Sequence, residues 1–231
     1  MNRRLDLHAI LVGDGDVPAR ATLDAAWPGW DAGASLVVAA DGGATKAIAA
    51  GLPPDLVVGD ADSLGAEGLA AVRKAGIPVE LSAAAKDESD LELAVLAAVA
   101  RGATRLTLLG ALGGPRFDHS LANVGLLGHP ALDGRAAALL DEATRVRLLD
   151  ATDGAASVHL AGVRGDLVSL FPFGGAALGV TTAGLAYPLR DEPLPIGLAR
   201  GLSNIRSGPE ARVSLRAGRL LIVETHTGGP V

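Results

Sequence analysis

Residues 36–44 decide the fold: they read LVVAADGGA, an apolar run that ends at an aspartate and two glycines. The run predicts a buried β-strand, and Ala44–Ala50 predicts a helix closed by Gly51. The same succession recurs along the first part of the chain. Further strands are expected at Ala9–Val12, Leu56–Val58, Leu106–Leu109 and Ala136–Leu140, and further helices at Ala66–Ala75, Asp90–Arg101 and Asp118–Leu127. Strands that alternate with helices form parallel sheets, so we expect an α/β domain whose strand ends share one rim.

Beyond about Asp150 the chain changes character, because short β-like runs are separated by glycine and proline and no amphipathic helix is evident. The runs are Ser157–Leu160, Asp166–Phe171, Leu178–Thr182, Ala211–Leu215 and Leu220–Glu224. This pattern predicts an all-β sandwich. We place the junction near Thr152–Gly154, which divides the chain into a parallel-sheet α/β domain over 1–150 and a β-sandwich domain over 151–231.

The composition is that of a globular protein. Of the 231 residues, 49% are hydrophobic and the mean hydropathy is +0.35, which leaves ample apolar surface for a core. Asp6 and His8 interrupt the N-terminal segment before the apolar core of a secretory signal could form. No run reaches the roughly 18 apolar residues of a membrane span. We therefore expect a cytoplasmic protein with no membrane partner.

Charge and cysteine content narrow the chemistry. The chain has no cysteine, which excludes disulfides, thiolate zinc sites and cysteine nucleophiles. A net charge of -6 and an aromatic content of 3% argue against a nucleic-acid partner, which would need basic patches and stacking platforms. An anionic ligand would need a metal bridge or a local basic cluster.

Two segments at predicted strand ends carry aspartates close together. Asp41, Gly42 and Gly43 open a helix, where backbone N–H groups and the positive helix end suit a phosphate; Asp41 could equally cap that helix. Asp60 and Asp62 are separated by one residue, and two neighbouring carboxylates repel each other unless a cation intervenes. Mg²⁺ prefers such hard oxygen ligands together with water and substrate phosphates.

A third segment, residues 86–92, reads KDESDLE at the start of a long helix. Ser89 and Glu92 fit a capping box, and Asp90 suits the first helical turn. Capping leaves Lys86 and the local density of acid unexplained, and a bound cation would relieve the repulsion.

The fourth segment, residues 110–119, reads GALGGPRFDH after another strand. It joins a flexible loop containing Gly113 and Gly114 to Arg116, whose guanidinium fits phosphate bidentately. Arg116 and Asp118 could alternatively form a salt-bridged helix start, and we interpret His119 as structural.

Aspartate and glycine thus occur together at four strand ends, although chance would scatter the 26 acidic residues over the surface. One shared site explains this recurrence better than four independent helix caps. We expect the site to hold divalent metal against nucleotide phosphates. Its carboxylates would be Asp41, Asp60, Asp62, Asp87, Asp90 and Asp118, of which Asp87 is the first that we would assign to structure instead.

The order of these segments resembles a known family. The segments DGGA (41–44), GDADS (59–63), KDESD (86–90) and GGPRFDH (113–119) are similar to the signatures of thiamine pyrophosphokinases, and TTAGLAYPL (181–189) and GLSN (201–204) extend the resemblance into the second domain. The resemblance implies an ATP- and Mg²⁺-binding α/β domain, followed by a β-sandwich that binds thiamine and forms a homodimer. It also implies that a diphosphoryl group passes from ATP to the hydroxyl of thiamine, releasing AMP.

The resemblance assigns a role to each matching position. It makes Asp60, Asp62 and Asp90 the Mg²⁺ ligands and places Asp118 near the attacking hydroxyl. It puts the triphosphate against Asp41, Gly42, Gly43, Lys86, Gly113, Gly114 and Arg116. Ser203 and Asn204 would help to bind thiamine across the dimer interface.

Two other functions remain open. A diphosphokinase that acts on another hydroxymethyl heterocycle, such as a pterin, would keep the acidic rim and change only the acceptor pocket. A non-catalytic nucleotide-sensing module would keep the fold, but it would have little need for Asp60, Asp62, Asp90 and Arg116 together.

Overall fold

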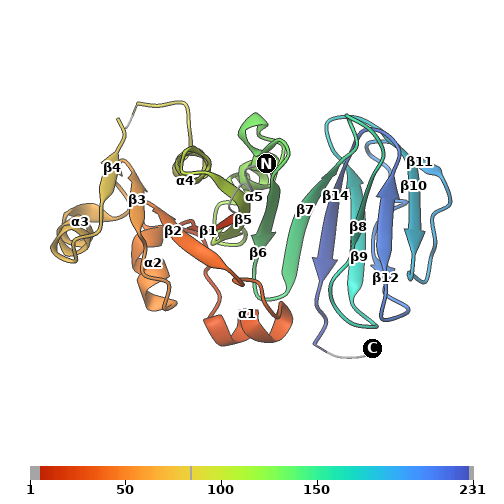
Figure 1. Ribbon diagram of the computed structural model, residues 1–231, viewed down its shortest axis with the longest axis horizontal. Coiled ribbons are helices and arrows are strands. Elements are labelled where there is room, and N and C mark those ends of the chain that lie inside the picture. The colour runs from red at the N-terminus through yellow and green to blue at the C-terminus, as the bar shows by residue number, and fades with distance from the viewer. Residues whose placement is uncertain (1–5, 84, 229–231) are drawn as a thin grey trace. The chain divides into compact units, whose positions relative to one another are not determined.

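The computed structural model describes residues 6–83 and 85–228 of the chain (Figure 1). Their contacts divide the chain into two compact units, with the boundary between Glu142 and Ala143. Each unit has a hydrophobic core of its own.

The first unit is built on a parallel sheet. Its strands are β1 (Leu7–Val12), β2 (Ala34–Ala40), β3 (Leu56–Gly59), β4 (Val79–Leu81), β5 (Ala103–Leu109) and β6 (Ala136–Leu140). They lie in the order β6-β5-β1-β2-β3-β4, and every neighbouring pair is parallel. Strands β1 to β4 succeed one another in one direction and β5 and β6 in the other. The strand order therefore reverses between β1 and β5, and ligands bind outside the carboxyl ends of the strands at such a point.

Helices cover both faces of this sheet. They are α1 (Arg20–Ala26), α2 (Gly43–Ala49), α3 (Gly65–Lys74), α4 (Asp90–Ala100) and α5 (Phe117–Leu126), with a short 3-10 helix, η1 (Pro130–Leu132). Ile10 and Val12 of β1 pack with Leu23 of α1 and Ala47 of α2 in one core. The intervening residues of β1 face the other side, where α4 packs over β1, β2, β3 and β5. Figure 1 shows α1 and α2 on one side of the sheet and α4 on the other.

The strands and helices expected in this half are confirmed, and the helix ends shift by at most one residue. Ser89 caps α4 as predicted, because its Oγ accepts a hydrogen bond from the backbone N–H of Glu92 at 3.2 Å. Helix α1 and strand β4 were not anticipated. Helix α1 has no side-chain cap and no acid in its first turn, and β4 is short and largely exposed, so neither has a strong sequence signal. Within the described ranges, no helix is both long and apolar enough to cross a membrane.

The second unit is the expected β-sandwich. It consists of strands β7 (Thr144–Asp150), β8 (Ala156–His159), β9 (Leu167–Pro172), β10 (Ala177–Ala183), β11 (Glu192–Leu194), β12 (Asn204–Ile205), β13 (Arg212–Leu215) and β14 (Arg219–Thr225). Four of them lie in the order β12-β9-β14-β7 and four in the order β11-β10-β13-β8, with antiparallel neighbours. Val168 and Ile222 from one sheet share a core with Val180 and Val213 from the other. No helix occurs among residues 143–228, as expected.

The boundary between the units precedes the junction that we expected near Thr152–Gly154. Strand β7 pairs with β14 along its whole length, so it belongs to the second unit. Strand β7 is hard to recognise in the sequence because it contains two arginines. In the structure, Arg145 and Arg147 bind Glu224, a carboxylate that is only 2% exposed, at 2.8 and 2.9 Å. Buried charges are tolerated when they are paired in this way, and the pairing makes a charged strand compatible with a sandwich.

Candidate active site

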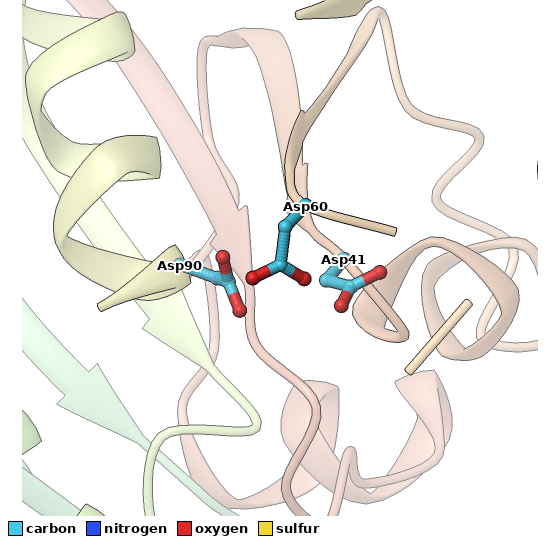
Figure 2. A group of neighbouring side chains, drawn as sticks. All are labelled: Asp41, Asp60 and Asp90. Atoms are coloured by element: carbon cyan, nitrogen blue, oxygen red, sulfur yellow. The ribbon is translucent and has the colours of Figure 1, made fainter. Parts of the chain in front are cut away.

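Three aspartates gather at the carboxyl ends of the parallel strands. Asp41 follows β2, Asp60 follows β3 and Asp90 begins α4. One carboxylate oxygen from each lies within 4.8 Å of the other two, close enough to share a metal ion. Figure 2 shows Asp60 between Asp90 and Asp41. The donors are all carboxylate oxygens, which are the ligands that Mg²⁺ prefers, so these residues fit the metal that the family resemblance implies.

Asp41 holds the turn that carries Asp60. It is 2% exposed and adopts a left-handed backbone with φ of 44°. Its two carboxylate oxygens accept hydrogen bonds from the backbone N–H groups of Ser63 and Leu64, at 2.9 and 3.0 Å. Asp41 therefore connects the end of β2 to the turn before α3, rather than capping its own helix.

Gly59 lets the three aspartates approach one another. Its φ is 138°, and a Cβ at this position would lie 3.0 Å from Cβ of Asp41 and 3.1 Å from Oδ1 of Asp90. A side chain here would be strained and would push the carboxylates apart.

Lys86 supplies the positive charge of this cluster. Its Nζ donates to Oδ1 of Asp90 at 2.6 Å, to Oδ2 of Asp60 at 3.2 Å and to Oγ of Ser82 at 3.0 Å. Burial acts to lower the pKa of Lys86, but the hydrogen bonds to Asp90 and Asp60 outweigh it, so this pKa lies above its ordinary value. Lys86 therefore remains charged and offsets the repulsion between the carboxylates.

Asp60 and Asp62 have different surroundings. The backbone N–H of Asp62 donates to Oδ1 of Asp60 at 3.1 Å, and this bond, followed by that from Lys86, holds the pKa of Asp60 below its ordinary value. Ala61 between them has φ of 69°, and the side chain of Asp62 is exposed. The structure thus brings Asp60 and Asp90 together with Asp41, while Asp62, predicted as a metal ligand, lies outside the group of three.

A cleft of about 360 Å³ adjoins the carboxylates. The loops after β1 and β5 line it, so it opens at the point where the strand order reverses. Among its lining residues are the predicted Asp41, Asp60, Lys86, Asp90, Gly113, Gly114 and Arg116, and also His119, which we had interpreted as structural.

Arg116 and Asp118 form an exposed, bidentate pair. Nε and one terminal nitrogen of Arg116 donate to the two carboxylate oxygens of Asp118, at 2.9 and 2.6 Å. The hydrogen bond from Arg116 is the main reason that the pKa of Asp118 is lowered to about 2, and the pKa of Arg116 is raised in return. The structure therefore realises the salt-bridged helix start that was one interpretation of this segment.

Five of the positions predicted in the first unit do not line the cleft: Gly42, Gly43, Asp62, Asp87 and Asp118. A Cβ on Gly42 would meet the carboxylate of Asp14 at 2.6 Å, and one on Gly43 would collide with the backbone at Val12. These glycines allow α2 to pack closely against the end of β1. Asp87 is exposed, in keeping with its ranking as the first aspartate to assign to structure.

Sequence reasoning missed the loop after β1. Gly13, Asp14 and Gly15 line the cleft, and Asp14 is paired with Lys46 at 3.0 Å. The signal was present, because residues 13–16 read GDGD directly after the predicted strand at 9–12. Ser120 and Asn123 of α5, which also line the cleft, have no comparable signal.

In the second unit, Asn204 binds a neighbouring loop. Its side-chain N–H donates to the carbonyl oxygen of Tyr187 at 2.6 Å, and its Oδ1 accepts from the N–H groups of Tyr187 and Ile205 at 3.0 and 2.9 Å. Asn204 is 7% exposed. Ser203 is exposed, with φ of 54°. Asn204 thus fixes the backbone around Tyr187, and Ser203 presents its side chain to solvent.

These features define a protein with a doubly wound α/β unit, an acidic cleft suited to a metal and a phosphate, and a β-sandwich unit. Family models match both units: the catalytic domain of thiamin pyrophosphokinase matches residues 30–138, and its vitamin B1 binding domain matches residues 157–220. The chain belongs to the thiamin pyrophosphokinase family.

Individual relatives agree with this assignment. Thiamine pyrophosphokinase of Bacillus subtilis (strain 168) is 25% identical over 191 residues, which is 83% of this chain and 87% of that protein. The crystal structure of thiamin pyrophosphokinase from Geobacillus thermodenitrificans has a TM-score of 0.77 and 25% identity, covering 97% of this chain and 100% of the other. A family member from Enterococcus faecalis gives 0.77 and 26%, covering 94% and 98%. Membership of this family implies a kinase-type enzyme.

Proposed function

We propose that this chain is an ATP-dependent diphosphotransferase that converts thiamine to thiamine diphosphate and releases AMP. The observation that carries the proposal is the group formed by Asp41, Asp60, Asp90 and Lys86 beside the cleft, in a chain that matches both family domains in order. A sensor module would bind nucleotide without needing this concentration of charge.

We assign Asp60 and Asp90 to Mg²⁺, because both are predicted ligands and their carboxylates lie together. Asp62 stays a predicted ligand. When bound, Mg²⁺ would neutralise charge on the phosphate oxygens of ATP.

The side chains of the cleft would position the triphosphate. Lys86 and Arg116 both line the cleft, and each is paired with aspartate. Each can exchange its carboxylate partner for phosphate oxygens, and a guanidinium suits the charge that develops on the transferred group. Positioning and electrostatics dominate phosphoryl transfer, so these roles require no proton transfer from either cation.

Asp118 is better suited to orienting Arg116 than to accepting a proton. A pKa of about 2 makes its carboxylate a weak base near neutral pH. The bidentate contact holds the guanidinium beside the glycine loop instead. We therefore assign Asp118 to the positioning of Arg116.

The second unit is the proposed site of thiamine binding. The match to the vitamin B1 binding domain over residues 157–220 supports it. Ser203 would contact the vitamin and Asn204 would hold the loop around Tyr187 in place. We retain the expectations of a homodimer and of a cytoplasmic location.

The reaction can be tested with purified protein, ATP, Mg²⁺ and thiamine, resolving the nucleotide products. The proposal requires AMP and thiamine diphosphate in equal amounts, and AMP only when thiamine is present. ADP would indicate ordinary kinase chemistry, AMP with a pterin alone would support the alternative acceptor, and intact ATP with every acceptor would support the sensor. Asp60→Asn should abolish product formation, whereas Asp133→Asn, at an exposed aspartate outside the cleft, should not.

A further inference from the structure

The loops after β1 and β5 are joined through their backbones where they line the cleft. The N–H of Gly13 donates to the carbonyl oxygen of Leu109 at 2.8 Å, and that of Gly15 donates to the carbonyl oxygen of Gly110 at 2.9 Å. A Cβ on Gly13 would lie 2.8 Å from the carbonyl oxygen of Gly110, closer than real Cβ atoms come. Glycine is therefore required for this contact, and the two loops form one connected surface.

Asp16 extends this connection to the glycine loop that precedes Arg116. Its Oδ2 accepts a hydrogen bond from the backbone N–H of Gly114 at 2.9 Å, although the two residues are far apart in sequence. A Cβ on Gly113 would lie 2.9 Å from the same oxygen. Gly113 and Gly114 both have φ of 76°, so the carboxylate meets a backbone conformation that only glycine adopts readily.

The same loop is anchored from α5. Oγ of Ser120 donates to the carbonyl oxygen of Gly113 at 3.2 Å, and the side-chain N–H of Asn123 donates to the carbonyl oxygen of Ala111 at 2.8 Å. These bonds hold two carbonyl groups, while Asp16 holds the backbone N–H group of Gly114. Asp16 thus holds the loop from the side of β1, and Ser120 and Asn123 hold it from α5.

We propose that Asp16, which does not itself line the cleft, is a positioning residue that fixes the loop from Gly113 to Arg116 for the triphosphate of ATP. The proposal rests on the function proposed above, because it assumes that the cleft binds ATP. Asp16 acts by accepting a hydrogen bond, so ATP binding requires its side-chain oxygen but not its negative charge. The N–H of Gly114 is engaged by Asp16, and phosphate contacts fall to other groups of the loop and to Arg116.

The test compares Asp16→Ala and Asp16→Asn with wild type, using direct ATP binding in the presence of Mg²⁺ and steady-state kinetics. Loss of one backbone hydrogen bond on an exposed loop predicts that Asp16→Ala weakens ATP binding and raises KM for ATP about fivefold. The KM for thiamine and the midpoint of thermal unfolding should stay unchanged. Asp16→Asn should restore ATP affinity to within about twofold of wild type, because the amide oxygen can replace the carboxylate as acceptor.

A second variant tests the contact from its other side. Gly113→Ala should also weaken ATP binding, and by less in the Asp16→Ala background, because part of the clash disappears with the carboxylate. Asp133→Ala is the matched control and should leave binding unchanged. Unaltered or tighter ATP binding in Asp16→Ala would overturn the proposal, and so would an Asn variant as impaired as the Ala variant. Failure of the wild-type protein to bind ATP would instead overturn the proposed function.

Discussion

Replacement of Lys86 by methionine should destabilise the first unit unless another cation is supplied. Methionine keeps the apolar length of the side chain and removes the ammonium group. In the wild-type protein, Nζ of Lys86 lies 2.6 Å from Asp90 and 3.2 Å from Asp60. The side chain of Lys86 is 12% exposed, that of Asp90 32% and that of Asp60 15%. The change therefore removes the ammonium group that pairs with Asp60 and Asp90, while the carboxylates of Asp41, Asp60 and Asp90 stay close together.

The expected loss follows from this burial. Removing one partner of a fully buried ion pair costs about 3–5 kcal/mol, and solvent screening at Asp90 reduces this to about 2–3 kcal/mol. At about 2–4 °C per kcal/mol for a chain of this size, the midpoint of thermal unfolding should fall by about 5–10 °C. Added Mg²⁺ should raise this midpoint more in Lys86→Met than in wild type, because the ion no longer competes with the ammonium group for the same oxygens.

The assay is thermal unfolding followed by circular dichroism, with and without MgCl₂, over a range of pH. Lys74→Met is the matched control, since Lys74 is exposed in the last turn of α3. The folded-state pKa of Asp60 is lowered, so its contribution to stability is present above the unfolded pKa and is lost as the pH falls through the folded value. The deficit of the variant should therefore shrink on acidification. Equal midpoints and equal Mg²⁺ responses in Lys86→Met and wild type would refute the reasoning.

Three further predictions concern other parts of the chain. Asp118→Asn should lower kcat less than about tenfold, because a carboxylate with a pKa of about 2 is a weak base. Arg116→Ala should lower kcat about 100-fold or more, because the guanidinium stabilises the charge that develops on the transferred group. Equal losses of kcat in the two variants would contradict this reasoning. Asn204→Ala should reduce the free energy of unfolding by about 1–3 kcal/mol, since it leaves the partly buried backbone N–H and carbonyl groups of Tyr187 without their partner. It should also raise KM for thiamine but not for ATP, and an unchanged KM for thiamine would separate Asn204 from the acceptor site. Burial lowers the pKa of His8 below its ordinary value, so the contribution of His8 to stability is lost as the pH falls. The free energy of unfolding of His8→Gln, measured with denaturant, should therefore depend less on pH than that of wild type.

Much of the fold could be predicted because its signals are local. The apolar strands predicted in the first unit stop at glycine or aspartate, and helices α2 to α5 end at glycines that can be recognised from the sequence alone. Strand β7 could not be recognised this way, because Arg145 and Arg147 become compatible with a sandwich only through Glu224, which lies on another strand. A signal of this kind depends on residues distant in sequence.

The candidate site was predictable to the level of strand ends but not of side-chain direction. Asp60 and Asp90 meet because the carboxyl ends of parallel strands share one edge. Sequence spacing alone cannot show whether Asp60 or Asp62 points toward Asp41 and Asp90, since the direction of each side chain depends on the left-handed backbone at Ala61. Asp14 and Asp16 followed the same strand-end rule and were overlooked because their partners, Lys46 and Gly114, come from other loops.

The pairing of charges explains how an acidic cleft could bind an anion. Lys86 and Arg116 both line the cleft, and both are already neutralised by aspartates. Triphosphate alone would have to remove these cations from their carboxylates and leave the carboxylates exposed to its own negative charge. Under the proposed function, Asp60 and Asp90 would hold a divalent ion, whose charge would replace that of Lys86. Lys86 would then be free to contact the phosphates, so each binding event would offset the cost of the other. Under the proposed function, nucleotide and metal should therefore bind cooperatively, and in Lys86→Met the metal should bind more tightly alone while its coupling to nucleotide weakens.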